Sequence, residues 1–154
     1  MRARDLMTSP AVTCHPNHSL ATAAQRMAEH DCGSLAVIDD SGRLAGTITD
    51  RDICMAAYTR GAALAELPVQ VAMRPGVIAA GPDETLKVIE ELMAENQLRR
   101  IPIIDDAGRP IGIVSLNDLA IESIAPDTRM KHGPAKVAYT LAAICRPPAA
   151  HRTA

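Results

Sequence analysis

The chain of 154 residues is 47% hydrophobic and 22% charged, a globular composition that fits one domain or two small ones and excludes a disordered protein. Its 16 basic and 18 acidic residues leave a formal net charge of −2, so no long-range positive field attracts nucleic acid or an anionic membrane. Phe and Trp are absent, so the core must be aliphatic, and base stacking on aromatic side chains is a weak explanation of function.

Two copies of one unit follow each other at an offset of 66 residues, with no gap between the matches. The matched pairs include Met7 with Met73, Pro16 with Pro82, Leu20 with Leu86, Gly46 with Gly112 and Asp52 with Asp118. The chain is therefore a tandem duplication.

Within each copy we expect the order strand, helix, strand, strand, helix. Apolar runs that end in Asp-Asp-x-Gly predict a β-hairpin, because glycine supplies the positive φ of the turn. The expected strands are residues 11–13, 35–38 and 44–48 in the first copy and residues 77–79, 101–104 and 110–114 in the second.

Apolar residues at i, i+3, i+4 and i+7 predict an amphipathic helix after the first strand of each copy, over residues 20–27 and 86–93. A second helix follows the hairpin in each copy. The expected caps are Asn17 or Ser19 and Asp83 or Thr85, and the second helices follow Thr49, ending near Gly61, and Ser115, ending before Pro126.

The repeat divides the chain into residues 1–61, a linker over residues 62–68, residues 69–125 and a tail over residues 126–154. A unit of about 55 residues buries only about 60% of its surface, so we expect the α+β copies to pack as a pseudo-twofold pair with ligand clefts at the seam. In the tail, Pro134 can start a short amphipathic helix. Its expected apolar stripe is Val137, Leu141, Ile144 and Cys145, covered by its own module, a dimer mate or a regulated partner.

Several motifs resemble the cystathionine-β-synthase-type (CBS) domain. They are Met7-Thr8, Val12-x-x-x-Pro16, Leu20-x-x-Ala23-x-x-x-Met27, Val37-Ile38-Asp39 and Gly46-Thr47-Ile48-Thr49-Asp50-Arg51-Asp52, with Arg100-Ile101-Pro102-Ile103 and Gly112-Ile113-Val114-Ser115-Leu116-Asn117-Asp118 in the second copy. The resemblance covers about residues 1–125 and leaves no catalytic domain over. It implies a stand-alone pair of βαββα units whose two clefts often bind adenosine-containing ligands, commonly as a disc-shaped dimer.

The family's ligand pattern, Gly-h-x-Ser/Thr-x-x-Asp, matches both copies, and it implies a carboxylate on a ribose and a hydroxyl residue near a phosphate. The residue types suit those tasks. A glycine lets backbone approach closely, the first turn of a helix offers N–H groups to a phosphate, and a carboxylate accepts hydroxyl protons from a ribose diol. The matching residues are Gly46, Thr49 and Asp52 in the first copy and Gly112, Ser115 and Asp118 in the second.

In such pairs the strand of one repeat usually faces the Ser/Thr-x-x-Asp of the other. The resemblance therefore implies a cleft with Thr49, Asp52, Arg99, Arg100, Ile101, Pro102 and Ile78, and a second cleft with Ser115, Asp118, Val12, Gly33, Ser34, Leu35 and Ala36. A guanidinium forms a charge-assisted fork with phosphate oxygens, and adjacent strand residues point to opposite faces, so we expect one arginine to enter the cleft. The hypothesis is that the cleft at Asp52 binds a phosphorylated nucleotide more tightly than the cleft at Asp118.

A purely structural interpretation of the same motif is also open. Ser/Thr-x-x-Asp at a helix start is a variant capping box, in which the two side chains satisfy each other's backbone donors. Capping and ligand binding can coexist in one motif.

Two further clusters predict structure rather than chemistry. The pairs Asp39-Asp40 and Asp105-Asp106 precede Gly42 and Gly108, which is typical of hairpin turns rather than of paired catalytic carboxylates. The segment Cys14-His15-Pro16-Asn17-His18 lacks the spacing of a zinc site, so we expect no metal.

No apolar run reaches the roughly 18 residues of a membrane span, and the N-terminus leads into no apolar signal segment. The four cysteines lie far apart with no C-x-x-C pair, which is typical of reduced intracellular thiols. We therefore expect a cytoplasmic protein.

The motifs together predict a non-catalytic sensor that binds an adenosine-containing nucleotide of the AMP, ADP or ATP class in the cleft between the repeats, without a catalytic cofactor. A homodimer is the expected assembly, and a protein partner stays open. The alternative is a structural dimerisation or protein-interaction module with vestigial clefts. An enzyme is a third and weaker interpretation.

Overall fold

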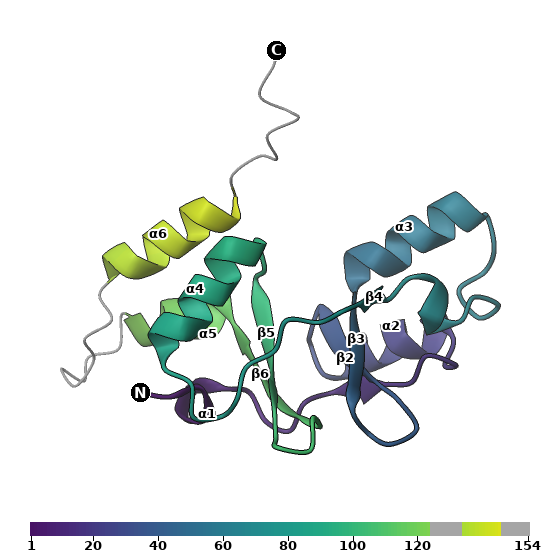
Figure 1. Ribbon diagram of the computed structural model, residues 1–154. Helices are drawn as coiled ribbons and strands as arrows, with labels where there is room; N and C mark the ends of the chain where they lie inside the picture. Colours follow the sequence, from purple (N-terminus) through teal and green to yellow (C-terminus); the bar gives the residue numbers. More distant parts are fainter. Residues whose placement is uncertain (124–133, 146–154) are drawn as a thin grey trace, which may run out of the picture. The chain divides into compact units, whose positions relative to one another are not determined.

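The computed structural model describes residues 1–123 and 134–145, which form two compact units that both mix helices and strands (Figure 1). This composition confirms the predicted α+β class. The first-repeat unit comprises Ser9–Ile78 and Ile104–Gly112, and the second-repeat unit comprises Met1–Thr8, Ala79–Ile103 and the chain from Ile113 onward. The N-terminal segment thus groups with the second repeat, which the repeat pattern did not predict.

The first-repeat unit is built on a four-stranded sheet in the order β1-β2-β3-β4. β1 (Thr13–Cys14) is parallel to β2 (Ser34–Ile38), which is antiparallel to β3 (Leu44–Thr49). β4 (Arg74–Pro75) adds an antiparallel edge strand beside β3. The turn between β2 and β3 holds Gly42 at a φ of 79°, which confirms the predicted hairpin.

Two helices, α2 (Leu20–Glu29) and α3 (Asp50–Arg60), contact each other and the sheet. Ser19 is the N-cap of α2, and its hydroxyl accepts a hydrogen bond of 3.1 Å from the N–H of Thr22. α3 ends at Gly61, which takes the left-handed conformation at a φ of 61°. Of the two caps considered for α2, the structure selects Ser19.

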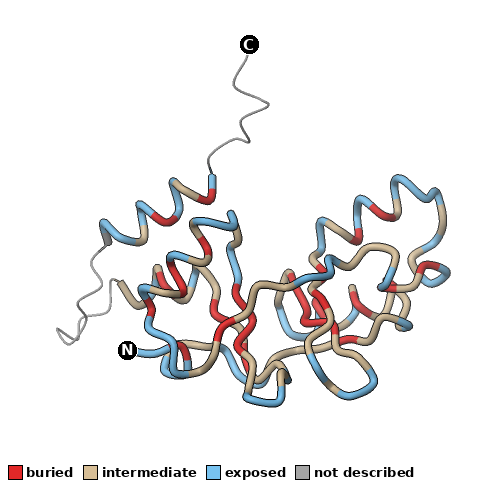
Figure 2. The backbone as a smooth tube through the Cα atoms, viewed as in Figure 1, coloured by how far each residue is buried: buried red, intermediate tan, exposed pale blue. Residues whose placement is uncertain are grey.

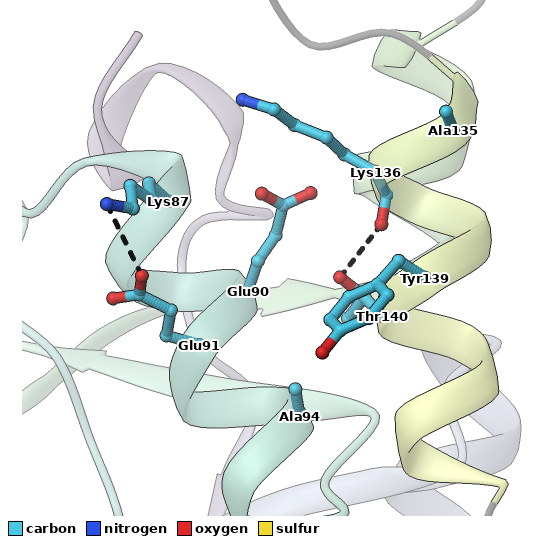
Figure 3. A pocket seen from close by; sticks show the side chains of 8 residues that line it. All are labelled: Lys87, Glu90, Glu91, Ala94, Ala135, Lys136, Tyr139 and Thr140. Carbon is cyan, nitrogen blue, oxygen red and sulfur yellow. Dashed lines mark hydrogen bonds and ion pairs between the residues drawn. The ribbon is translucent and has the colours of Figure 1, made fainter.

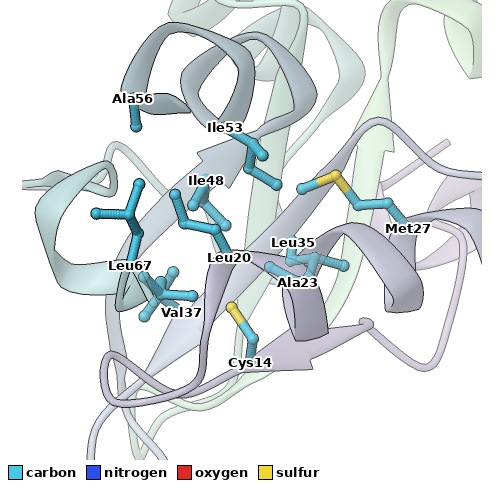
Figure 4. Packing of buried hydrophobic residues seen from close by; sticks show 11 residues of the cluster. Cys14, Leu20, Ala23, Met27, Leu35, Val37, Ile48, Ile53, Ala56 and Leu67 are labelled. Carbon is cyan, nitrogen blue, oxygen red and sulfur yellow. The ribbon is translucent and has the colours of Figure 1, made fainter. Parts of the chain in front are cut away.

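The core of the first-repeat unit is aliphatic, as the absence of Phe and Trp requires (Figure 4). Leu35, Val37 and Ile48 from the sheet are completely buried and meet Leu20 and Met27 from α2. Burying one such side chain stabilises the fold by roughly 1.5–3 kcal/mol. These apolar positions hold the strands and helices that carry the motif residues.

The predicted linker is ordered against the first-repeat unit. The carbonyl oxygen of Leu67 accepts a hydrogen bond of 2.8 Å from the N–H of Leu20, and that of Leu64 accepts one of 3.1 Å from the N–H of Ala21. A 3-10 turn, Val69–Val71, follows, and its first residue is completely buried. The segment therefore closes over the start of α2 and leads directly into β4.

The second repeat contains α4 (Leu86–Asn96), α5 (Leu116–Ser123) and the strands β5 (Arg100–Ile104) and β6 (Pro110–Ser115), which pair with each other. The tip of this hairpin, Ile104–Gly112, groups with the first-repeat unit. The central residues of β5 are buried, as those of β2 are (Figure 2). Thr85 caps α4 through a longer hydrogen bond of 3.5 Å to the N–H of Val88.

The N-terminal segment is part of this second-repeat unit. After α1 (Ala3–Leu6), Thr8 pairs with Ile113 of β6 through hydrogen bonds of 2.9 and 3.0 Å. Ala3 is completely buried, and its N–H donates to the carbonyl oxygen of Glu84 over 2.8 Å. The segment therefore supplies the second repeat with the edge that β4 supplies to the first.

The short strands at the start of each copy differ from the prediction. The first is observed at Thr13–Cys14 rather than over residues 11–13. The second, predicted over residues 77–79, is not a strand, and a single parallel bridge joins Ala80 to Ile103. In the first copy only Thr13 of the predicted triplet lies in the strand, and in the second copy the one bridging residue, Ala80, lies just beyond the predicted triplet.

The predicted tail helix is present as α6 (Pro134–Ile144), which packs on α4 and α5 of its own unit (Figure 1). Its predicted stripe is partly wrong. Thr140 and Ile144 are buried, whereas Leu141 is 45% exposed and Cys145 is exposed, because residues 140 and 144 lie one turn apart on the face of α6 that packs on its own unit. The rest of the predicted tail, residues 126–133 and 146–154, lies outside the described residues.

None of the described helices has the length and apolar character that crossing a membrane requires.

Candidate functional site

The motif of the first repeat lies where β3 passes into α3. Thr49 ends the strand and is the N-cap of the helix, which places Asp52 in the first helical turn. The Thr49 hydroxyl donates to Oδ2 of Asp52 over 2.6 Å, and the Thr49 N–H donates to the same oxygen over 3.0 Å. The N–H of Asp52 donates back to Oγ1 of Thr49 over 3.1 Å. The capping box is therefore complete.

The second oxygen of Asp52 is held by Arg74 of β4. Nε and Nη2 of the guanidinium donate to Oδ1 over 3.0 and 2.8 Å. The Asp52 side chain is 11% exposed and the Arg74 side chain 65% exposed. Burial raises the pKa of the Asp52 carboxyl, but the hydrogen bonds from Thr49 and Arg74 outweigh it and hold that pKa below its ordinary value.

Gly46 places β4 close enough for this ion pair. It lies opposite Pro75 in the β3–β4 ladder, and Thr47 lies opposite Arg74. A Cβ on Gly46 would lie 2.5 Å from Cε of Met73 and 2.8 Å from the carbonyl oxygen of Arg74. We expected this glycine to make room for a ligand, but the group that approaches it is the chain's own edge strand.

The motif of the second repeat lies at the matching junction of β6 and α5. The Ser115 hydroxyl and N–H donate to Oδ2 of Asp118 over 2.6 and 2.7 Å, and the Asp118 N–H donates to Oγ of Ser115 over 3.2 Å. Within the described part of the chain, no group donates to Oδ1 of Asp118. The two motifs therefore have the same capping hydrogen bonds at Oδ2 of the aspartate and differ at Oδ1.

The first turn of α3 is not the open N–H cradle that we expected for a phosphate. The N–H of Asp50 donates to the carbonyl oxygen of Gly33 over 3.2 Å, and the N–H of Arg51 donates to Oδ1 of Asp50 over 2.7 Å. With the N–H of Asp52 on Thr49, the first three donors of the helix already have partners. An anion gains little there from backbone donors alone.

The remaining predicted site residues fall into exposed, half-buried and core positions. Leu35 and Ile101 are completely buried, so their side chains serve the cores, and only their backbone could meet a ligand. The other positions are Arg99 and Arg100, which are exposed, Ile78 and Val12, which are half-buried, and Pro102 and Ser34, which are buried. Arg99, Arg100, Ile101 and Pro102 belong to a different unit from Asp52, as do Val12, Ser34 and Leu35 from Asp118, so these contacts stay predictions.

The sequence analysis missed Arg74. The offset of 66 residues carried the signal, because Arg74 is the counterpart of Thr8, and Thr47 is the counterpart of Ile113. The structure pairs Arg74 with Thr47 and Thr8 with Ile113, so the two residues hold equivalent places beside the two motifs.

The clusters predicted to be structural have structural partners. Oδ1 of Asp39 accepts from the N–H of Ser41 and of Arg43, each over 2.9 Å, and Oδ1 of Asp105 accepts from the N–H of Arg109 over 2.8 Å, as hairpin turns require. His15 contacts Asp40 over 2.8 Å. Across the described residues, no three His, Cys, Asp or Glu side chains gather to hold a metal ion.

A pocket of about 340 Å³ lies between α4 and α6 in the second-repeat unit (Figure 3). Lys87 pairs with Glu91 over 3.6 Å at its rim, and Thr140 Oγ1 donates to the carbonyl oxygen of Lys136 over 3.1 Å on its α6 side. The pocket contains none of the predicted nucleotide-binding residues.

Comparison with known proteins assigns the fold. The sequence matches the CBS domain model over residues 3–58 and 66–124. It is 34% identical over 125 residues to CBS domain-containing protein YhcV of Bacillus subtilis, covering 81% of this chain and 87% of that protein. It is 35% identical over 119 residues to Hypoxic response protein 1 of Mycobacterium tuberculosis, covering 77% and 82%.

Solved structures show the same architecture. The CBS domain pair of protein MJ0100, crystallised with 5′-methylthioadenosine and S-adenosyl-L-methionine, matches with a TM-score of 0.72 at 28% identity, covering 79% of this chain and 94% of that one. Hypoxic Response Protein I with two coordinated zinc ions matches with a TM-score of 0.71 at 30% identity, covering 79% and 98%. The chain therefore belongs to the CBS domain family and carries two copies of the domain.

Proposed function

We propose that this chain is a non-catalytic regulatory module that binds an adenosine-containing nucleotide of the AMP, ADP or ATP class, with Asp118 and Asp52 as ribose ligands. The observation that carries the proposal is the carboxylate of Asp118, of which only one oxygen accepts hydrogen bonds from the described residues. Ser115 orients it through Oδ2, and Oδ1 has lone pairs available for the hydroxyls of a ribose diol. The ligands of the similar MJ0100 pair are both adenosine derivatives, which supports recognition of the adenosine part of such a ligand.

Regulation follows from preferential binding to one arrangement of the module. A ligand that binds only the folded, competent form stabilises it by about 2.7 kcal/mol at a hundredfold excess over Kd. At roughly 2–4 °C per kcal/mol for a chain of this size, Tm rises by about 5–10 °C. A ligand that bound every arrangement equally would transmit no signal.

The test is a thermal-shift and calorimetry panel of AMP, ATP, NAD and S-adenosylmethionine on the full chain. Charge-assisted hydrogen bonds contribute about 1.5–3 kcal/mol, so Asp118→Asn should weaken binding of the responding compound at its site by about 10- to 100-fold. Asp106→Asn is the matched control, because it removes an exposed carboxylate from a hairpin turn. Equal affinity in both variants would contradict the ribose role of Asp118.

The non-catalytic part of the proposal has its own test. The bound nucleotide should be recovered chemically intact after prolonged incubation, as chromatography would show. Turnover of any compound in the panel would contradict this part and favour an enzyme. The other predicted contacts, Arg99 and Arg100 first among them, stay predictions that alanine variants in the same calorimetric assay check.

A second candidate, a dimerisation or protein-interaction module, is favoured by exposed apolar side chains on the helices α3 and α6. Tyr58 and Met55 on α3 are 82% and 47% exposed, and Tyr139 on α6 is 67% exposed. Contiguous apolar patches mark association sites, and Met55 and Tyr58, three residues apart, lie on the same side of α3. A wild-type dimer in sedimentation velocity that Tyr58→Ser dissociates, with no response to the nucleotide panel, would favour this candidate over the first.

A further inference from the structure

The Asp52 carboxylate has no hydrogen-bonding capacity left. Oδ2 accepts two hydrogen bonds from Thr49, and Oδ1 accepts two from Arg74. These four are about as many as a carboxylate can accept. A ribose diol can therefore bind Asp52 only after the guanidinium has left. Because Asp52 is 11% exposed and Arg74 is 65% exposed, the arginine is the partner that can swing into solvent.

Asp118 faces no such competition. Ser115 holds Oδ2 in the same geometry, but the residue at the place of Arg74 is Thr8, whose side chain carries no guanidinium. Within the residues described, Oδ1 of Asp118 accepts no hydrogen bond. The two copies thus carry the same proposed ribose acceptor, which is accessible at Asp118 and occupied by an ion pair at Asp52.

We propose that Arg74 makes ligand binding at Asp52 depend on a phosphate group, whereas binding at Asp118 needs only the nucleoside. This inference rests on the proposed nucleotide function and assigns a specificity determinant to it. A nucleoside offers hydroxyls to Asp52 but nothing to the displaced guanidinium, so two charge-assisted hydrogen bonds are lost. A nucleotide offers the hydroxyls to Asp52 and a phosphate to Arg74, so both charges keep a partner.

The closed N-terminus of α3 strengthens this assignment. Its first three N–H groups donate to Gly33, Asp50 and Thr49, so the backbone does not replace the guanidinium as a phosphate donor. The Arg74–Asp52 ion pair therefore discriminates between nucleotides and nucleosides, because a nucleoside must break the ion pair and offers the guanidinium no new partner.

The test compares AMP with adenosine by titration calorimetry, one site at a time in the full chain. In the Asp118→Asn background, AMP should bind at Asp52 at least tenfold more tightly than adenosine. Adding Arg74→Ala should bring the affinities for AMP and adenosine to within about threefold of each other. Adding Arg60→Ala instead, which removes an exposed arginine at the end of α3, should leave the preference for AMP unchanged.

The reciprocal experiment uses the Asp52→Asn background, which leaves the site at Asp118. AMP and adenosine should bind there with affinities within about threefold of each other, and adding Thr8→Arg should create a preference for AMP. A tenfold preference before Thr8→Arg is introduced would overturn the inference.

A readout without ligand checks the ion pair itself. In the free protein, Arg74→Ala should raise the pKa of the Asp52 carboxyl, whereas Arg60→Ala should leave this pKa unchanged. A pH titration monitored by NMR measures the pKa in each variant. If Arg74→Ala leaves the pKa of Asp52 unchanged, the ion pair on which the inference rests is absent and the inference is overturned.

The failures are distinguishable. Binding of AMP with a preference over adenosine that survives Arg74→Ala overturns the role of Arg74 and leaves the proposed function standing. Binding of neither compound, nor of any other in the panel, overturns both.

Discussion

Replacing Gly46 by alanine should loosen the edge of the first-repeat sheet and, with it, the Arg74–Asp52 pair. The new Cβ would lie 2.5 Å from Cε of Met73, a flexible side-chain end that can rotate away. It would also lie 2.8 Å from the carbonyl oxygen of Arg74, which is backbone, so β4 itself must move. Overpacking of this kind costs about 1–3 kcal/mol. At roughly 2–4 °C per kcal/mol, Tm should fall by about 2–12 °C.

Thermal unfolding followed by circular dichroism measures this effect, with Gly81→Ala as the matched control. A Cβ on Gly81 meets no atom within 4 Å, and its φ lies outside the left-handed region. That substitution should be neutral or stabilising by up to about 1 kcal/mol, because it restricts only the unfolded chain. If both variants melt at the wild-type temperature, the close approach of β4 is not what requires glycine at position 46, and the argument is refuted.

Two further predictions concern ionisable groups. The folded-state pKa of Asp52 lies below its unfolded value of about 3.9, so the stability it contributes is complete above that value and disappears as pH falls through the folded pKa. Urea unfolding of wild type and Asp52→Asn should therefore differ at pH 6, and the difference should shrink as pH falls below about 3.9, whereas a constant difference would contradict the role of the ion pair. Burial raises the pKa of the Cys14 thiol to about 11, so at pH 8 a thiol reagent should modify the exposed Cys54 and Cys145 and reach Cys14 only on unfolding. Mass spectrometry of the partly labelled protein checks the order, and early labelling of Cys14 would contradict it.

The elements that the sequence predicted well are those whose signal is local. The turn glycines Gly42 and Gly108 have positive φ values of 79° and 78°, and Gly61 ends α3 as its position indicated. These outcomes depend on backbone preferences within a few residues. Residues 77–79 did not form a strand, because a β-prone triplet has no structure until a neighbouring strand pairs with it, and here only Ala80 does so.

The partner of Asp52 was harder to predict, because it comes from 22 residues further along the chain. Arg74 lies beyond the linker, in the segment that the repeat pattern assigns to the second copy, yet its strand completes the sheet of the first. The N-terminal segment completes the second repeat in the same way through Thr8. Each copy thus borrows its edge from the segment that leads into the other copy, and this exchange is set by strand pairing rather than by local propensity.

The capping box is compatible with the proposed ligand site, because the cap leaves one oxygen of the aspartate out of its hydrogen bonds. In both repeats the cap uses Oδ2 of the aspartate, so the helix start is satisfied whether or not a ligand is present. Only Oδ1 is left to respond to a ligand, and in the first repeat Arg74 already occupies it. A duplicated motif can therefore keep its structural role in both copies, while the proposal assigns the difference in ligand binding to the residue that pairs beside the motif, Arg74 in one copy and Thr8 in the other. The functional asymmetry of the pair should accordingly follow positions 8 and 74 rather than the motif itself.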